Sequence, residues 1–183
     1  MNKYLRALIV GVLLLSASGV TAASSFNVTS EDGKTGKLGP DHFATVMGCT
    51  GQNISPQIAW SGAPEGTKSF AVSIYDQDAP TGSGWWHWSV INIPASVHEL
   101  ARGAGSDPSK LPAGAVQTNS DAGVPSYGGP CPPSGTTHRY TITVKALKVD
   151  KLEVSPNATG ALIGLKTNMN SIGEVTLVLT GTR

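Results

Sequence analysis

The sequence predicts a mostly β protein, an antiparallel two-sheet β-sandwich with one short helix toward its C-terminal end. Two observations lead to this prediction. Apolar and polar residues alternate in several short runs, which is the pattern of strands with one buried face. The 22 glycines and 12 prolines are scattered between these runs, where they favour turns over helices. Because the chain has no internal repeat and no linker, we expect one domain.

Four runs have the features of strands: three of them alternate apolar and polar residues, and the second is rich in β-branched and aromatic residues. They are residues 69–75, 87–93, 139–147 and 174–182. In the first run Phe70, Val72 and Ile74 alternate with smaller or polar residues. The stretch between the second and third runs, residues 101–137, is a long Gly/Pro-rich loop. A loop of that length in a compact domain is usually functional or ordered by its own packing.

Residues 155–173 are the expected helix. Ser155 and Pro156 form a cap and first-turn pair, which is a common way for a helix to begin. Three apolar residues then recur at helical spacing: Leu162, Leu165 and Met169. Two glycines inside the run weaken its helical propensity, so we expect a short helix.

The first 23 residues have the features of a secretory signal peptide. Lys3 and Arg6 precede an apolar run over residues 7–17, and small residues follow it. That run is shorter than the ~20 residues that span a bilayer, which disfavours the alternative of a membrane anchor. We expect cleavage after Ala22 or Ala23, a mature domain at 24–183, and a periplasmic or secreted location. The absence of a cysteine at the cleavage point argues against a lipoprotein.

The mature chain carries almost no net charge. The signal holds two of the 13 basic residues and none of the 12 acidic ones, so the mature net charge is −1. Without a basic block, nucleic acid is not an expected partner. Without a second long apolar run, no stable membrane insertion is expected.

Two cysteines, Cys49 and Cys131, remain in the expected exported chain. Both lie in Gly/Pro-rich loops, and an even count in an exported protein favours a disulfide over two buried thiols. A bridge closing a loop of this length stabilises the folded state by roughly 4 kcal/mol in the chain-entropy model.

Residues 75–92, YDQDAPTGSGWWHWSVIN, gather two aspartates, three tryptophans and a histidine in one turn. Chemistry alone leaves several kinds of site open. An aspartate at the end of a strand, with a second acid two residues on, is typical of dehalogenase-type phosphatases, but their fold needs alternating helices and strands. A metal site lacks H-x-H or H-E-x-x-H spacing. Its candidate ligands are Asp76, Asp78, His87 and His138.

A serine hydrolase and a binding pocket are the two remaining alternatives. Ser83 and Ser134 are candidate nucleophiles beside the histidines, although no G-x-S-x-G elbow is present. A binding pocket would combine aromatic walls, imidazoles and backbone N–H groups around a small ligand. In that interpretation Gly128 and Gly129 leave their backbone N–H groups accessible to the ligand.

Residues 75–88 and 128–147 together closely resemble the phosphatidylethanolamine-binding protein family. The resemblance is to its bacterial, often periplasmic, Raf kinase inhibitor-like branch. Residues 53–60, NISPQIAW, look like the N-terminal motif of the family. The similarity covers nearly all of the mature chain, and three motifs in the right order make it specific.

The resemblance implies a two-sheet β fold with one small cavity for anions such as phosphate, acetate or phosphoryl headgroups. Asp76, Asp78 and Pro80 match the D-P-D-A-P motif of the family, in which Gln77 here replaces the first proline. The ligand-binding residues carried over are Asp76, Asp78, Pro80, Trp86, His87, Gly129, Pro130, Pro132, Pro133, His138 and Tyr140. The two histidines are expected to donate hydrogen bonds to the ligand. Asp76 is expected to accept from a protonated ligand oxygen or to orient an imidazole.

The expected function is therefore binding of a small anionic or phosphoryl ligand by an exported, soluble protein. We expect no catalysis, no cofactor and no metal. The alternative is an esterase- or phosphatase-type hydrolase that uses the same His/Asp pocket. An unidentified protein partner and a dimer are left open by the sequence.

Overall fold

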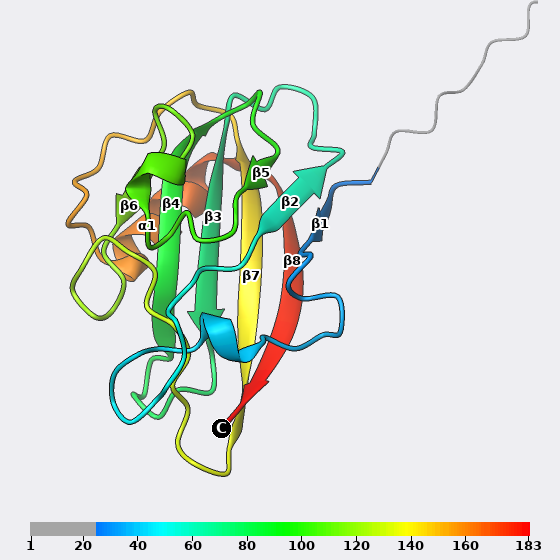
Figure 1. Cartoon of the computed structure of the whole chain (residues 1–183). Helices are drawn as coiled ribbons and strands as arrows, with labels where there is room; N and C mark the ends of the chain where they lie inside the picture. The colour runs from blue at the N-terminus through cyan, green and yellow to red at the C-terminus, as the bar shows by residue number, and fades with distance from the viewer. Residues whose placement is uncertain (1–24) are drawn as a thin grey trace, which may run out of the picture.

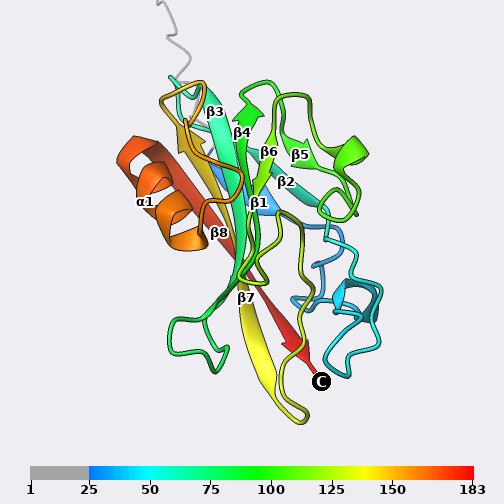
Figure 2. The same cartoon turned by 90° about the vertical axis from the view of Figure 1, so that its left-hand side faces the viewer.

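The structure, a computed structural model, describes residues 25–183 and has two antiparallel sheets and one α-helix. The order in the large sheet is β6 (Val116–Thr118), β4 (Trp85–Pro94), β3 (Ser69–Asp76), β7 (Thr137–Leu147) and β8 (Ser171–Thr182). The order in the small sheet is β1 (Asn27–Thr29), β2 (Ile58–Ser61) and β5 (Glu99–Leu100). The small sheet covers one face of the large sheet and α1 (Gly160–Asn170) covers the other (Figures 1 and 2). The predicted fold class is confirmed.

The expected signal peptide at 1–23 lies outside the described residues. Within 25–183 no helix is both long and apolar enough to cross a membrane.

The main core lies between the two sheets, and it explains the alternation predicted for β3 and β7. The apolar residues that alternate along β3 and β7 all point inward. They meet the small sheet through Ile58 and Trp60 of β2. Their register places Val72 opposite Val144 and Ile74 opposite Ile142. Strands with one buried face keep this alternation, because a shift by one residue would expose the apolar set.

Helix α1 begins later than the sequence predicted. Its N-cap is Thr159, whose hydroxyl accepts from the Leu162 N–H, and not the Ser155-Pro156 pair. The buried side of the helix contains Ile163, which belongs to a second, smaller apolar cluster, and Thr167. The three residues with helical spacing, Leu162, Leu165 and Met169, lie on the exposed side.

A β-bulge in β4 decides which side chains reach the core at the end of the large sheet. Ile74 pairs with Trp88 while Tyr75 pairs with Trp86, so His87 is an extra residue in β4. Trp86 therefore follows Tyr75 onto the helix side of the sheet, where their ring centroids lie 4.6 Å apart. His87 turns toward the inter-sheet core, where its ring centroid lies 5.4 Å from that of Tyr140.

The long loop of residues 101–137 is ordered by short elements of its own and by contacts with the core. It contains β6 and a short 3-10 helix, Pro108–Lys110. Tyr127 is buried in the inter-sheet core, and its hydroxyl donates to the carbonyl of His42. These contacts fix the segment that follows, residues 128–133, against the end of the large sheet.

Candidate functional site

Four residues form a buried polar group, here called the Asp76 cluster: Asp76, His87, His138 and Tyr140. They come from the end of β3 and the starts of β4 and β7, which meet at the lower end of the large sheet in Figure 1. The Asp76 carboxylate is at the centre and only 3% exposed. His138 Nδ1 lies 2.7 Å from one of its oxygens, and the Asp78 N–H donates to the other.

His87 is held in one orientation by the loop above it. Its Nδ1 lies 2.6 Å from the carbonyl oxygen of Gly128, which fixes the proton on Nδ1. The other ring nitrogen, Nε2, lies 3.9 Å from Asp76 Oδ2. This Nε2 atom is buried and has no hydrogen-bond partner among residues 25–183. It can accept a hydrogen bond when the ring is neutral and donate one when the ring is protonated.

The Tyr140 side chain lies beside both histidines of the cluster, with its ring centroid 5.4 Å from that of His87 and 6.5 Å from that of His138. It is fully buried, and its hydroxyl also finds no hydrogen-bond partner in the described part of the chain. Burial, together with the negative charges of Asp76 and Asp78, raises the pKa of Tyr140. The phenol therefore stays protonated at neutral pH and can donate a hydrogen bond.

Asp76 is ionised at neutral pH in spite of its burial. Burial by itself raises the pKa of this carboxyl, because it disfavours the charged form. The two imidazoles and the Asp78 N–H stabilise the carboxylate more strongly, so the pKa of Asp76 is lowered overall. The cluster thus contains a fixed negative charge beside two titratable rings.

Asp78 lies outside this cluster and forms an ion pair with Arg139. Its two oxygens accept from the guanidinium of Arg139 at 2.9 and 2.6 Å, and one also accepts from the Arg139 backbone N–H. This bidentate ion pair lowers the pKa of Asp78 to about 2. The structure therefore places the carboxylate in a partly exposed ion pair rather than beside the histidines.

The segment of residues 128–133, here called the Gly/Pro wall, contains two glycines whose N–H groups are not accessible to a ligand. The Gly128 N–H donates to the His87 carbonyl, and the Gly129 N–H donates to the Asn53 side chain at 2.7 Å. The expectation that both would face a ligand is wrong, because the neighbouring chain already uses them. Gly129 instead allows close packing, since a Cβ there would lie 2.4 Å from the His42 carbonyl oxygen.

The prolines differ in their positions. Pro130 and Pro132 are buried, and the Pro130 carbonyl accepts from the Ala44 N–H. Pro133 and Pro80 are exposed, the latter in the turn after β3. Two of the four prolines therefore pack inside the protein, and two lie at its surface.

Trp86 is not brought together with the histidines. It lies on the opposite face of the large sheet and lines a small cavity of about 90 Å³ under α1. A Cβ on Gly160 would lie 2.4 Å from its ring. Trp88 is the tryptophan on the inner face, fully buried, with its indole N–H bonded to Gln117.

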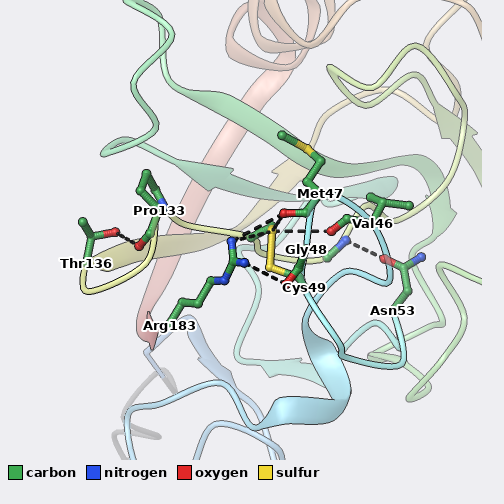
Figure 3. Close-up of a disulfide and its surroundings, with 10 residues drawn as sticks. Val46, Met47, Gly48, Cys49, Asn53, Pro133, Thr136 and Arg183 are labelled. Carbon is green, nitrogen blue, oxygen red and sulfur yellow. Dashed lines mark hydrogen bonds between the residues drawn. A yellow bond between two sulfur atoms is a disulfide. The ribbon is translucent and has the colours of Figure 1, made fainter.

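The predicted disulfide between Cys49 and Cys131 is confirmed. It joins the loop of residues 44–53 to the Gly/Pro wall, and Figure 3 shows it beside Arg183. Asn53 supports the wall from the other side, since its amide also donates to the Tyr127 carbonyl. Sequence reasoning gave Asn53 no role, although it opens the NISPQIAW motif.

Within residues 25–183, no group of three or more His, Cys, Asp or Glu side chains is arranged to hold a metal ion.

Comparison with known proteins gives one consistent family. The family model described as phosphatidylethanolamine-binding protein matches residues 29–182. The UPF0098 protein YbcL of Escherichia coli is 50% identical over 179 residues, which cover 95% of this chain and 98% of that protein.

Solved structures agree with this result. The crystal structure of YbcL, described as a new member of the mammalian PEBP family, superposes with a TM-score of 0.83 over 87% of this chain and 99% of that chain, at 48% identity. A PEBP homolog from Chlamydia trachomatis gives a TM-score of 0.69 at 28% identity, over 87% of this chain and 97% of that chain. A Mycobacterium tuberculosis protein named as a lipoprotein, LppC, is 36% identical over 133 residues, 72% of this chain and 62% of that protein.

Proposed function

The chain belongs to the phosphatidylethanolamine-binding protein family, and on this premise we propose that it binds a small anion or phosphoryl group at the Asp76 cluster. The ligand chemistry is that of a phosphate oxygen, from free phosphate or from a phosphoryl headgroup. Asp78 and Trp86 take no part in this binding. Asp78 forms an ion pair with Arg139, and Trp86 lies on the opposite face of the large sheet.

The observation that supports the proposal most strongly is the buried His87 Nε2 atom without a protein partner. A buried polar atom left without a hydrogen bond costs roughly 1–3 kcal/mol, so such a position favours an occupant that supplies one. A phosphoryl oxygen can accept from a protonated His87 and from the Tyr140 hydroxyl. A protonated ligand oxygen can donate to Asp76, which offsets the repulsion between two negative groups.

We also propose that the protein is exported. The N-terminal pattern of the sequence, the Cys49–Cys131 disulfide and the similarity to a protein named as a lipoprotein support this location. Mass spectrometry of the mature protein is expected to find an N-terminus near Ala23 or Ser24. Full-length chain recovered from membranes would contradict it.

Calorimetric titration of the mature protein with phosphate tests the site. The variants His87→Ala and His138→Ala are expected to bind about ten- to a hundredfold more weakly, because each removes a hydrogen bond to a charged group worth roughly 1.5–3 kcal/mol. The control is His98→Ala, an exposed histidine outside the cluster. Wild-type affinity in both cluster variants would mean that phosphate binds elsewhere.

The proposed function is binding without turnover. A hydrolase using the same cluster would release p-nitrophenol from p-nitrophenyl phosphate or p-nitrophenyl acetate. It would lose that activity in the variant His87→Ala. Turnover with this dependence on His87 would replace the binding proposal.

A further inference from the structure

The cavity of about 90 Å³ under α1 is separate from the Asp76 cluster. Helix α1 covers the outer face of the large sheet (Figure 2), and strands β3, β4, β7 and β8 all contribute residues to the lining of the cavity. The Asp76 cluster lies on the inner face, where Tyr140 belongs to the main core. None of the four cluster residues lines the cavity, so its occupation does not depend on phosphate binding at the cluster.

Gly164 leaves open space in the middle of α1 beside this cavity. A glycine inside a helix destabilises it relative to most other residues. At Gly160 close packing explains the glycine, because a Cβ there would lie 2.4 Å from the Trp86 ring. At Gly164 an added Cβ would meet no other part of the described chain within 4 Å. Packing inside the protein therefore does not require Gly164, and the space that it leaves can be used by a ligand.

A row of hydroxyl side chains crosses the large sheet at the level of the cavity, one from each strand. The register of the sheet pairs them in the order Thr118, Ser89, Ser73, Thr143 and Thr176. They lie on the face that α1 covers, because the residues next to them along β3, β4, β7 and β8 point into the inter-sheet core. The middle two members of the row, Ser73 and Thr143, line the cavity.

The row lacks hydrogen bonds at its buried end. Ser89 is 1% exposed and Thr118 is 0% exposed, and neither hydroxyl has a hydrogen-bond partner among residues 25–183. Facing hydroxyls on neighbouring strands of this sheet can bond directly, as those of Thr137 and Thr182 do at 2.8 Å. A buried hydroxyl without a partner is unfavourable, so the row favours an occupant that supplies hydrogen bonds.

The charges in the lining balance each other. Lys145 of β7 and Glu174 of β8 are paired in the sheet and form an ion pair of 3.0 Å. The Lys145 side chain is 15% exposed and also donates to Asn168, which leaves one of the three ammonium donors free. The cavity therefore has no net charge that would select an anion or a cation.

Thr167 adds a buried acceptor to the lining. Its side chain is 4% exposed, and its hydroxyl donates to the Ile163 carbonyl at 2.9 Å. The oxygen therefore keeps its lone pairs for a donor from the cavity.

We propose that this cavity binds a small uncharged polyol. A hydroxyl group both donates and accepts, so one polyol can bond to Ser73 and Thr143. The same molecule can accept from Lys145 and donate to Thr167, while the Trp86 ring packs against its carbon chain. At ~10–15 Å³ for each enclosed water molecule, the cavity of about 90 Å³ has room for roughly six to nine of them. A four-carbon polyol such as erythritol fits this space.

NMR titration of the isotope-labelled mature protein with erythritol tests the site. We expect saturable changes in the amide resonances of Gly164 and Thr167 and in the indole N–H resonance of Trp86. The dissociation constant is expected to be on the order of a few millimolar. The Trp86 resonance is identified by its loss in Trp86→Phe. The absence of saturable changes would mean that the cavity holds water alone, and changes centred on His87 and His138 would place the polyol in the Asp76 cluster. Either result would overturn the proposal.

The variant Gly164→Leu tests whether erythritol occupies the cavity. A leucine places a larger side chain in the space beside the cavity, so we expect the affinity for erythritol to fall by at least about tenfold. The variant should unfold at a higher urea concentration than the wild type, because leucine has the higher helix propensity. The control is Ala161→Leu, which adds the same side chain at an exposed position of α1. A folded Gly164→Leu variant that binds erythritol as the wild type does would contradict the proposal.

The variant Thr143→Val tests the row of hydroxyls, because it removes one hydroxyl and keeps the shape of the side chain. We expect erythritol to bind about three- to tenfold more weakly, since one neutral hydrogen bond is lost. The control is Thr141→Val, on the same face of β7 but outside the lining of the cavity. Wild-type affinity in Thr143→Val, or equal losses in the two variants, would mean that the row does not contact the polyol.

Discussion

The substitution Asp76→Asn removes the negative charge of the Asp76 cluster and keeps the shape of the side chain. Asp76 is 3% exposed and accepts from His138 Nδ1 at 2.7 Å and from the Asp78 N–H at 2.8 Å. An amide has one acceptor oxygen, so it can satisfy only one of these two donors. A hydrogen bond to a charged group contributes roughly 1.5–3 kcal/mol, and we expect the free energy of unfolding at pH 7 to fall by that amount.

Urea denaturation followed by tryptophan fluorescence, with the disulfide intact, measures this loss. The matched control is Asp150→Asn, since the Asp150 side chain is 83% exposed and pairs weakly with Lys68. Surface changes of this kind usually alter the free energy of unfolding by less than about 0.5 kcal/mol. Equal stability of Asp76→Asn and the wild type at pH 7 would mean that the Asp76 carboxylate does not stabilise the folded protein.

The dependence on pH checks the cause of the loss. The pKa of Asp76 is lowered in the folded protein, below the value of about 3.9 expected in the unfolded chain. Its contribution to stability is therefore complete above the unfolded pKa and is lost as pH falls through the folded pKa. The difference between wild type and Asp76→Asn is expected to narrow below about pH 4. A difference that stays constant into the acid range would contradict the charge as its origin.

Three further perturbations have clear expected results. The variant Cys49→Ser should lower the free energy of unfolding by up to roughly 4 kcal/mol in urea denaturation, because the bridge closes a long loop; an unchanged midpoint would contradict this. In Arg139→Gln, the pKa of Asp78 should rise from about 2 toward its ordinary value in an NMR titration, and a pKa that does not move would assign the shift to another group. Gly160→Val should destabilise the protein by about 1–3 kcal/mol in urea denaturation, because a Cβ there would lie 2.4 Å from the ring of Trp86; wild-type stability would mean that α1 packs differently.

The sequence predicted the long strands because burial of one face imposes alternation on them. Residues 69–75 and 139–147 lie inside β3 and β7, and their apolar positions form the inter-sheet core. The short strands of the small sheet could not be predicted in this way, since three residues such as Asn27–Thr29 are too few to show a period. The helix start was misplaced because Thr159 caps it from within the expected run.

The sequence predicted those site residues that family motifs identify. It did not predict features that depend on the backbone geometry of the folded chain. Family motifs brought His87 and His138 correctly to Asp76. The bulge at His87 places Trp86 on the other face of the sheet, and no feature of the local sequence indicates the extra residue in β4. The Gly129 N–H donates to the Asn53 side chain, which lies in a loop far away in the sequence, so only the folded structure could reveal this hydrogen bond.

The most direct test of the central claim is a crystal structure of the mature protein soaked with arsenate, a phosphate analogue that anomalous scattering locates. We expect an arsenate oxygen within hydrogen-bond distance, about 2.7–3.2 Å, of His87 Nε2, with a second oxygen facing Asp76. Arsenate found only beside Arg183, in a second cavity that lies next to the disulfide, with water alone at the Asp76 cluster, would contradict this claim.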